Sequence, residues 1–176
     1  MIQRVTLVSI FLLVSMLLII ISSCNDNYEE SDITPIDWQH RLVTSFPNDS
    51  LRTGTTYLSV YSQIYSLTQH RKHDLTATIS LRNTSISDTL YINKATYYDT
   101  HGKLIRSYVT SSIFISPLET VEIVIDEIDK AGGTGANFIF EWTTKKESTD
   151  PLFEGVMIST SGQQGLSFTT QGRRIK

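Results

Sequence analysis

The sequence predicts an all-β fold, with antiparallel strands in two packed sheets. From Thr55 onward, apolar and polar residues alternate with a period of two, which is typical of strands with one buried face. Turn-forming residues separate these segments at short intervals, and no window long enough for a helix shows helical spacing. Strands without intervening helices favour an antiparallel two-sheet sandwich of immunoglobulin-like type, with about seven to nine strands.

Three segments show the alternation most clearly. Residues 75–82 and residues 121–126 place an apolar side chain at every second position, with mainly polar residues between. A third segment places Phe138, Phe140 and Trp142 on one face. Because aromatic side chains bury large areas, these three predict a densely filled core layer.

Weaker alternation predicts the remaining strands. Clusters of Gly, Pro, Asn, Asp and Ser mark the turns between them. The weaker candidates are residues 56–66, 89–98, 103–111, 112–115, 153–160 and 165–170.

Ahead of the folded domain, which is predicted at residues 55–176, lies a segment of different composition. Residues 24–54 are rich in Asn, Asp, Glu, Ser, Thr and Pro without sustained periodicity, which predicts a flexible tether. Four apolar residues interrupt this polar segment, and their spacing predicts one short helical turn or a strap against the domain. They are Trp38, Leu42, Val43 and Phe46, for which we favour packing over a binding role.

The N-terminus has the pattern of an export signal. Arg4 and the amino terminus precede residues 5–21, which contain no charge. Residues 21–24, Ile-Ser-Ser-Cys, resemble the lipobox of bacterial lipoproteins. This resemblance implies that residues 1–23 are a signal peptide.

The lipobox resemblance also implies a modification. Cleavage between Ser23 and Cys24 is followed by attachment of a diacylglycerol to the Cys24 sulfur and by acylation of the new amino group. Two or more acyl chains hold a protein durably at a membrane. The expected location is the bacterial cell envelope, facing the periplasm or the outside. Two alternatives stay open: an uncleaved transmembrane helix at residues 5–21, at the short end of spanning length, and ordinary secretion.

Composition excludes one partner class and one source of stability. Without residues 1–23 the chain has 153 residues, with 14 Lys and Arg against 18 Asp and Glu, a net charge of −4. A nucleic-acid partner is therefore not expected, because phosphate binding needs a basic patch. Cys24 is the only cysteine, so no disulfide forms within one chain.

Five blocks carry a resemblance to a known family. One is Leu-Thr-Ala-Thr-Ile-Ser-Leu-Arg-Asn-Thr, and another is Tyr-Tyr-Asp-Thr-His-Gly-Lys-Leu-Ile-Arg-Ser-Tyr. The blocks lie at residues 57–65, 75–84, 97–108, 132–142 and 156–173. They resemble a family of bacterial envelope proteins known only as a domain of unknown function. The resemblance implies a compact β domain behind an export signal, and it supplies no activity and no functional residues.

Metal and catalytic motifs are weak. His70, His73 and Asp74 offer three ligands, but the two cations between the histidines oppose a metal ion and favour a solvated loop. The glycines in residues 132–135 lack the Lys-Ser/Thr ending and the helix of a phosphate loop, and favour a turn. We expect no metal, no cofactor and no enzymatic activity. A small hydrolase with a site built from separate loops is the alternative.

Two kinds of candidate site are proposed from loops. Gln163, Gln164 and Arg173 are candidate contacts for a ligand or partner, because loops on a rigid sandwich carry binding residues. An ordinary hairpin is the alternative. Ser50 and Thr89 each follow Asp and precede Leu. They resemble short O-glycosylation sites of some Gram-negative envelope proteins.

Together these features predict a lipid-anchored envelope protein that works as a noncatalytic binding or assembly module. The expected partners are the membrane, through lipid on Cys24, and another envelope protein or a small polar ligand. A structural role is the alternative, in which a sheet edge or the tyrosines Tyr57, Tyr61 and Tyr65 pack against a neighbouring protein.

Overall fold

A computed structural model of the chain describes residues 38–47, 50–160 and 165–176. All of them belong to one compact unit, Ile36–Lys176. The predictions for Ser23 and Cys24 lie outside the described residues, as do those for Gln163 and Gln164. Within the described part of the chain, no helix has the length and apolarity needed to cross a membrane.

The described residues form one short 3-10 helix and twelve strands, and every strand pairing is antiparallel. Their bounds are η1 (Gln39–Arg41), β1 (Leu51–Val60), β2 (Gln63–Ser66), β3 (Thr68–Asp74), β4 (Thr76–Arg82), β5 (Leu90–Tyr98), β6 (Leu104–Val109), β7 (Ile113–Ile115), β8 (Thr120–Ile125), β9 (Ala136–Lys145), β10 (Leu152–Ser159), β11 (Leu166–Gln171) and β12 (Arg173–Arg174).

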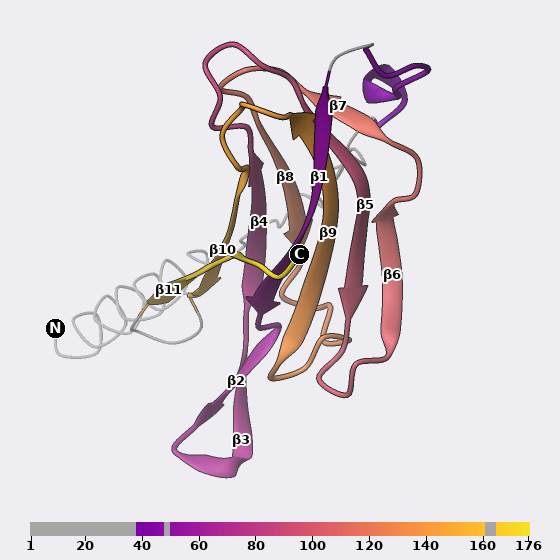
Figure 1. The fold of residues 1–176 in the computed structure, drawn as a ribbon. Coiled ribbons are helices and arrows are strands. Elements are labelled where there is room, and N and C mark those ends of the chain that lie inside the picture. Colours follow the sequence, from indigo (N-terminus) through magenta and orange to yellow (C-terminus); the bar gives the residue numbers. More distant parts are fainter. Residues whose placement is uncertain (1–37, 48–49, 161–164) are drawn as a thin grey trace, which may run out of the picture. The chain divides into compact units, whose positions relative to one another are not determined.

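The strands make a sandwich of two larger sheets (Figure 1). The six-stranded sheet has the order β12-β1-β9-β5-β6, with β7 also paired to β5, and the four-stranded sheet has the order β11-β10-β4-β8. The all-β, antiparallel, two-sheet class predicted from the sequence is confirmed. The separate pair β2-β3 and the two-residue strand β12 add to the seven to nine strands predicted.

Stacked aromatic rings join the two sheets at the core. Phe138 and Phe140 of β9 lie with ring centroids 5.3 Å apart, and Phe140 lies 4.3 Å from Phe153 of β10, in the opposite sheet. All three side chains are buried. Since burial of one such side chain contributes about 1.5–3 kcal/mol, this stack contributes strongly to sheet association.

The alternation predicted for β4 and β8 is confirmed. Apolar residues face the core, and the residues between them are mostly more exposed. The buried members are Ala77, Ile79, Leu81, Val121, Ile123 and Ile125.

The segment before β1 packs on the domain, as predicted for its apolar residues. Trp38 packs against the core ahead of η1. Leu42 then forms a bridge with Ile113 of β7, and the Val43 amide donates to the Ser112 carbonyl at 2.9 Å. Strand β1 begins at Leu51, inside the stretch 24–54 predicted as a tether, because its pairing with β9 continues through polar residues that show no apolar alternation.

The predicted strand 56–66 is two strands, because the chain bends between them. The amides of Ser62 and Gln63 both donate to the Gly133 carbonyl, at 3.1 and 3.0 Å. Gly133 has a φ of 67°, which a glycine adopts without strain, so the glycine-rich segment forms a turn as predicted. The Ser62 hydroxyl also bonds the Tyr97 hydroxyl at 2.9 Å, and burial raises the pKa of Tyr97 to about 12.

The loop predicted around His70 and His73 is wrong, because both residues lie in strand β3. Among the described strands, β3 pairs with β2 alone, and the hairpin extends beyond the two larger sheets (Figure 1). No residue of Thr68–Asp74 is buried. A strand with no core-facing side lacks the alternation by which strands are recognised in a sequence.

Candidate functional site

The described candidate residues lie in three places. Arg173 is exposed in β12 and pairs with Tyr57 of β1. Ser50 is exposed directly before β1, and Thr89 is half-buried directly before β5. Contact of Arg173, Gln163 and Gln164 with a ligand or partner stays a prediction, as does glycosylation of Ser50 and Thr89.

A groove lies where residues 42–47, which we call the strap, cross the outer face of the six-stranded sheet. Three adjoining open hollows of about 250, 420 and 300 Å³ form this strap groove. They share lining residues: Leu51 borders the first two, and Thr89 and Tyr91 border the first and the third. Figure 1 shows η1, just before the strap, at the end of the sandwich where β1 begins.

The groove wall combines an aromatic pair with polar side chains. Phe46 of the strap meets Tyr91 of β5 edge to face, with ring centroids 5.1 Å apart. Residues of the sheet face the groove because they alternate with core residues; Tyr91, for example, lies between the buried Leu90 and Ile92. The polar members are Thr44, Ser45, Thr53, Ser87, Asp88, Thr89, Asn93, Ser112, Thr143 and Lys145.

Hydrogen bonds fix the groove's polar side chains. The Asn93 side-chain nitrogen Nδ2 donates to the Thr143 hydroxyl at 2.7 Å, and the Ser112 hydroxyl donates to Asn93 Oδ1 at 3.1 Å. Asp88 and Lys145 form an ion pair at 3.8 Å. The groove therefore offers a small set of pre-oriented donors and acceptors beside an aromatic edge, as small-ligand sites do.

The turn that carries Asp88 and Thr89 is held by a buried asparagine. Asn83 Nδ2 lies within hydrogen-bond distance of three carbonyl oxygens, those of Asp88 at 2.8 Å and of Ile115 and Ser116 at 3.0 Å. Its Oδ1 accepts from the Ser85 amide at 3.0 Å. One side chain thereby joins the turn after β4 to the turn after β7.

An ion pair fastens the start of the strap. The Arg41 guanidinium lies 2.6 Å from Glu119, whose second oxygen accepts from the Ser116 amide at 2.7 Å. The Arg41 hydrogen bond and the Ser116 amide together lower the pKa of Glu119 to about 2, against the effect of burial. Glu119 therefore remains charged, and the strap fastened, at neutral pH.

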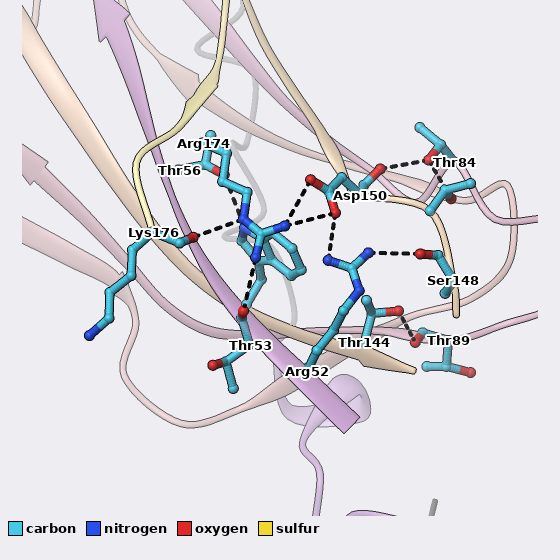
Figure 2. A network of polar contacts seen from close by, with 12 residues as sticks. Arg52, Thr53, Thr56, Thr84, Thr89, Thr144, Ser148, Asp150, Arg174 and Lys176 are labelled. Carbon is cyan, nitrogen blue, oxygen red and sulfur yellow. Dashed lines mark hydrogen bonds and ion pairs between the residues drawn. The ribbon is translucent and has the colours of Figure 1, made fainter. Parts of the chain in front are cut away.

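A second polar cluster lies at the end of the sandwich where β1 begins, and its contacts cover a core residue. Asp150 lies between Arg52, at 2.6 Å, and Arg174, at 3.2 Å (Figure 2). Both guanidiniums also lie over the Trp142 ring, 5.2 and 5.1 Å from its centroid, and Trp142 is fully buried. Since the two guanidiniums share one carboxylate and cover a core tryptophan, we assign this cluster a structural role.

Arg173 is the contact residue predicted from the sequence, whereas the neighbouring Arg174 makes these contacts. Strand β12 lies beside β1, so its two arginines point to opposite sides, and the one on the Trp142 side meets Asp150. The two-residue strand is too short for its alternation to be recognised in the sequence.

The four histidines are spread over three parts of the chain. His40 lies in η1, His70 and His73 lie in β3, and His101 lies in the turn after β5. In residues 38–47, 50–160 and 165–176, no group of three or more His, Cys, Asp or Glu side chains is placed to hold a metal ion.

Comparisons with known proteins give a family and no activity. The family model described as "Protein of unknown function (DUF3124)" matches residues 53–175. No curated protein matches the chain. The crystal structure of Thermotoga maritima 1070 is similar over 72% of this chain and 96% of that chain, at 11% identity and a TM-score of 0.43.

Proposed function

The chain belongs to the family of proteins of unknown function DUF3124, and on that premise we propose that it is a lipid-anchored protein of the bacterial cell envelope. Its β-sandwich is a noncatalytic binding module, and the strap groove is its ligand site. The observation that carries this proposal is that residues 42–47 form one wall of the groove. The segment that leads back towards the proposed lipid on Cys24 thus takes part in the binding site.

The anchor is supported by the order of the N-terminal sequence. An uncharged run at residues 5–21 ends in Ile-Ser-Ser-Cys, and a polar segment follows. With two or more acyl chains on Cys24, the domain is held at a membrane surface by the residues before the strap.

The lining of the groove favours a polar ligand that carries hydroxyl or amide groups. Asn93, Thr143 and Ser112 present fixed donors and acceptors, and the rings of Phe46 and Tyr91 offer apolar edges. Asp88 and Lys145, which line the first hollow, form an ion pair, so their charges balance. The hollow therefore has no preference for a strongly charged ligand. A saccharide fragment has this combination of hydroxyls and apolar ring faces.

The proposal is tested by calorimetric titration of the detergent-extracted full chain with N-acetylglucosamine oligomers. Phe46→Ala removes the strap's ring from the groove, and we expect it to weaken binding about tenfold. Val124→Ala is the matched control, because Val124 is a half-exposed apolar residue on the other sheet.

Three outcomes count against the proposal. If no oligomer binds, the groove is not a saccharide site. If Phe46→Ala and Val124→Ala bind alike, the site lies elsewhere. If the oligomers are cleaved, the hydrolase alternative replaces the noncatalytic module.

A further inference from the structure

The hairpin β2-β3 is the one strand pair in the described residues that belongs to neither sheet of the sandwich. It follows the end of β1 at Val60, whereas the strap groove lies at the beginning of β1 near Leu51. The hairpin therefore extends from the end of the domain opposite the groove (Figure 1). This position leaves its tip accessible while the groove is occupied.

The tip of the hairpin exposes apolar side chains. Leu67 connects the two strands and is 88% exposed, and Tyr65, the last residue but one of β2, is 57% exposed. Leu67 has a φ of 62°, a left-handed conformation that glycine and asparagine adopt far more readily. Because this leucine is exposed and its backbone is strained, we infer that its side chain contacts a binding partner and does not stabilise the fold.

The distal hairpin is also basic, although the chain as a whole is acidic. Residues 65–73 include Arg71, Lys72 and two histidines but no Asp or Glu, whereas the whole chain has a net charge of −3. The Lys72 ammonium lies over the Tyr65 ring, 5.5 Å from its centroid. Cations and apolar side chains therefore occupy the same tip.

The acidic residue closest in sequence to Arg71 and Lys72 is Asp74, at the end of β3, and it already has partners of its own. Asp74 accepts from the Gln63 side-chain nitrogen Nε2 at 2.7 Å and lies 2.6 Å from the Lys130 ammonium, and these contacts lower its pKa. Asp74 thus faces the sandwich side of the hairpin, and among the described residues no carboxylate forms an ion pair with Arg71 or Lys72.

We propose that this hairpin tip binds an anionic membrane surface. Leu67 and Tyr65 enter the region between headgroups and acyl chains, and Arg71 and Lys72 contact lipid phosphates. A protein partner fits less well, because a stable protein interface needs about 800 Å² from each side, more than two apolar side chains at a narrow tip provide. Membrane binding by the hairpin is independent of the proposed groove function. It is tested in a Cys24→Ser protein, which cannot carry the proposed lipid.

The test places an environment-sensitive fluorophore at the tip. In a Cys24→Ser background a new cysteine is the only thiol, since the chain has one cysteine. Leu67→Cys carries the probe at the tip, and Ile86→Cys is the matched control, because Ile86 is 82% exposed and lies in the turn after β4, at the groove end. Both full-length proteins keep the same N-terminal segment, so any attachment through it is equal.

Each labelled protein is added to vesicles of phosphatidylcholine alone, or of an equal mixture with phosphatidylglycerol. We expect the probe at residue 67 to brighten and shift to the blue with the anionic vesicles, with little change at residue 86. Added salt reduces the response, because it screens the charges. An equal response at both positions, or an equal response to both vesicle types, overturns the proposal.

A second arm tests the cations at the tip. Arg71→Glu with Lys72→Glu reverses both charges, and we expect about tenfold more anionic lipid to be needed for the same response at residue 67. Lys146→Glu with Lys176→Glu makes the same change of net charge at exposed residues outside the hairpin. If both double variants respond alike, net charge explains the effect and the hairpin is not the binding element.

Discussion

The Trp142 ring occupies the space that a side chain on Gly54 would need. The two residues are partners across β1 and β9, and a Cβ atom at residue 54 would lie 2.2 Å from the nearest ring carbon. The indole nitrogen donates to the Thr56 hydroxyl at 2.9 Å, which fixes the ring over the glycine. This contact lies beneath Arg52 and Arg174, at the end of the sheet that carries the groove.

Gly54→Ala is predicted to destabilise the domain. The methyl group overlaps a fully buried ring, so strands β1 and β9 have to separate locally, at a cost of about 1–3 kcal/mol or more. Urea unfolding of both proteins measures the change. Gly165→Ala is the control, because a Cβ there meets no atom within 4 Å. Equal losses for the two variants would show that the Trp142 contact is not responsible.

The ion pair of Glu119 with Arg41 predicts a pH-dependent contribution to stability. The pKa of Glu119 falls from 4.5 to about 2 on folding, so the folded state favours the charged form. The contribution is therefore fully present above about pH 4.5 and is lost as the pH falls towards 2.

Glu119→Gln tests this dependence. We expect the variant to lose about 1–3 kcal/mol of unfolding free energy at pH 7 and the difference from wild type to shrink below pH 4.5. Denaturant titrations at several pH values measure it. A difference that stays constant down to pH 2 would contradict the assignment to this carboxylate.

Asn83→Asp is predicted to cost more than Asn83→Ala. The amide nitrogen of Asn83 faces three carbonyl oxygens, so alanine leaves acceptors without a donor, and aspartate adds a negative oxygen that repels them. We expect a loss of about 1–3 kcal/mol for alanine and a larger loss for aspartate at pH 7. Thermal unfolding compares the two, and the reverse order would show that Nδ2 does not hold the turns.

Leu67→Gly is predicted to separate stability from membrane binding. Glycine relieves the left-handed backbone but adds freedom to the unfolded chain, so stability stays equal or rises by up to about 1 kcal/mol. Leu118→Gly is the control, since Leu118 also has a positive φ, of 59°, and lies outside the hairpin. Co-sedimentation with anionic vesicles should fall for Leu67→Gly alone. A large loss of stability would instead mean that Leu67 supports the fold.

The strands that were predicted best from the sequence are those with one face buried in the core. In residues 138–142, for example, Phe138 and Phe140 alternate with less buried side chains, and the period of two reports this burial directly. The hairpin strand β3 was missed for the opposite reason, because neither of its faces meets the core.

The strap groove could not be predicted from the sequence, because its lining residues come from segments that lie far apart in the chain. Trp38 and Phe46 indicated packing of the segment before β1, but nothing in the sequence placed Phe46 beside Tyr91 or Asn93 beside Thr143. These neighbours follow from the order of β1, β9 and β5 in the sheet, which local patterns do not determine. The one signal that the sequence offered was the set of residues in β9 that alternate with the core residues, because Thr143 and Lys145 of this set line the groove.

The central claim, a domain tethered to a membrane through lipid on Cys24, is tested most directly by the mass of the mature protein from native membranes. The account predicts residues 24–176 with a diacyl or triacyl adduct on Cys24, and release of a soluble protein by Cys24→Ala. An unprocessed N-terminus, with full membrane retention of Cys24→Ala, would make residues 5–21 a transmembrane helix and contradict the account.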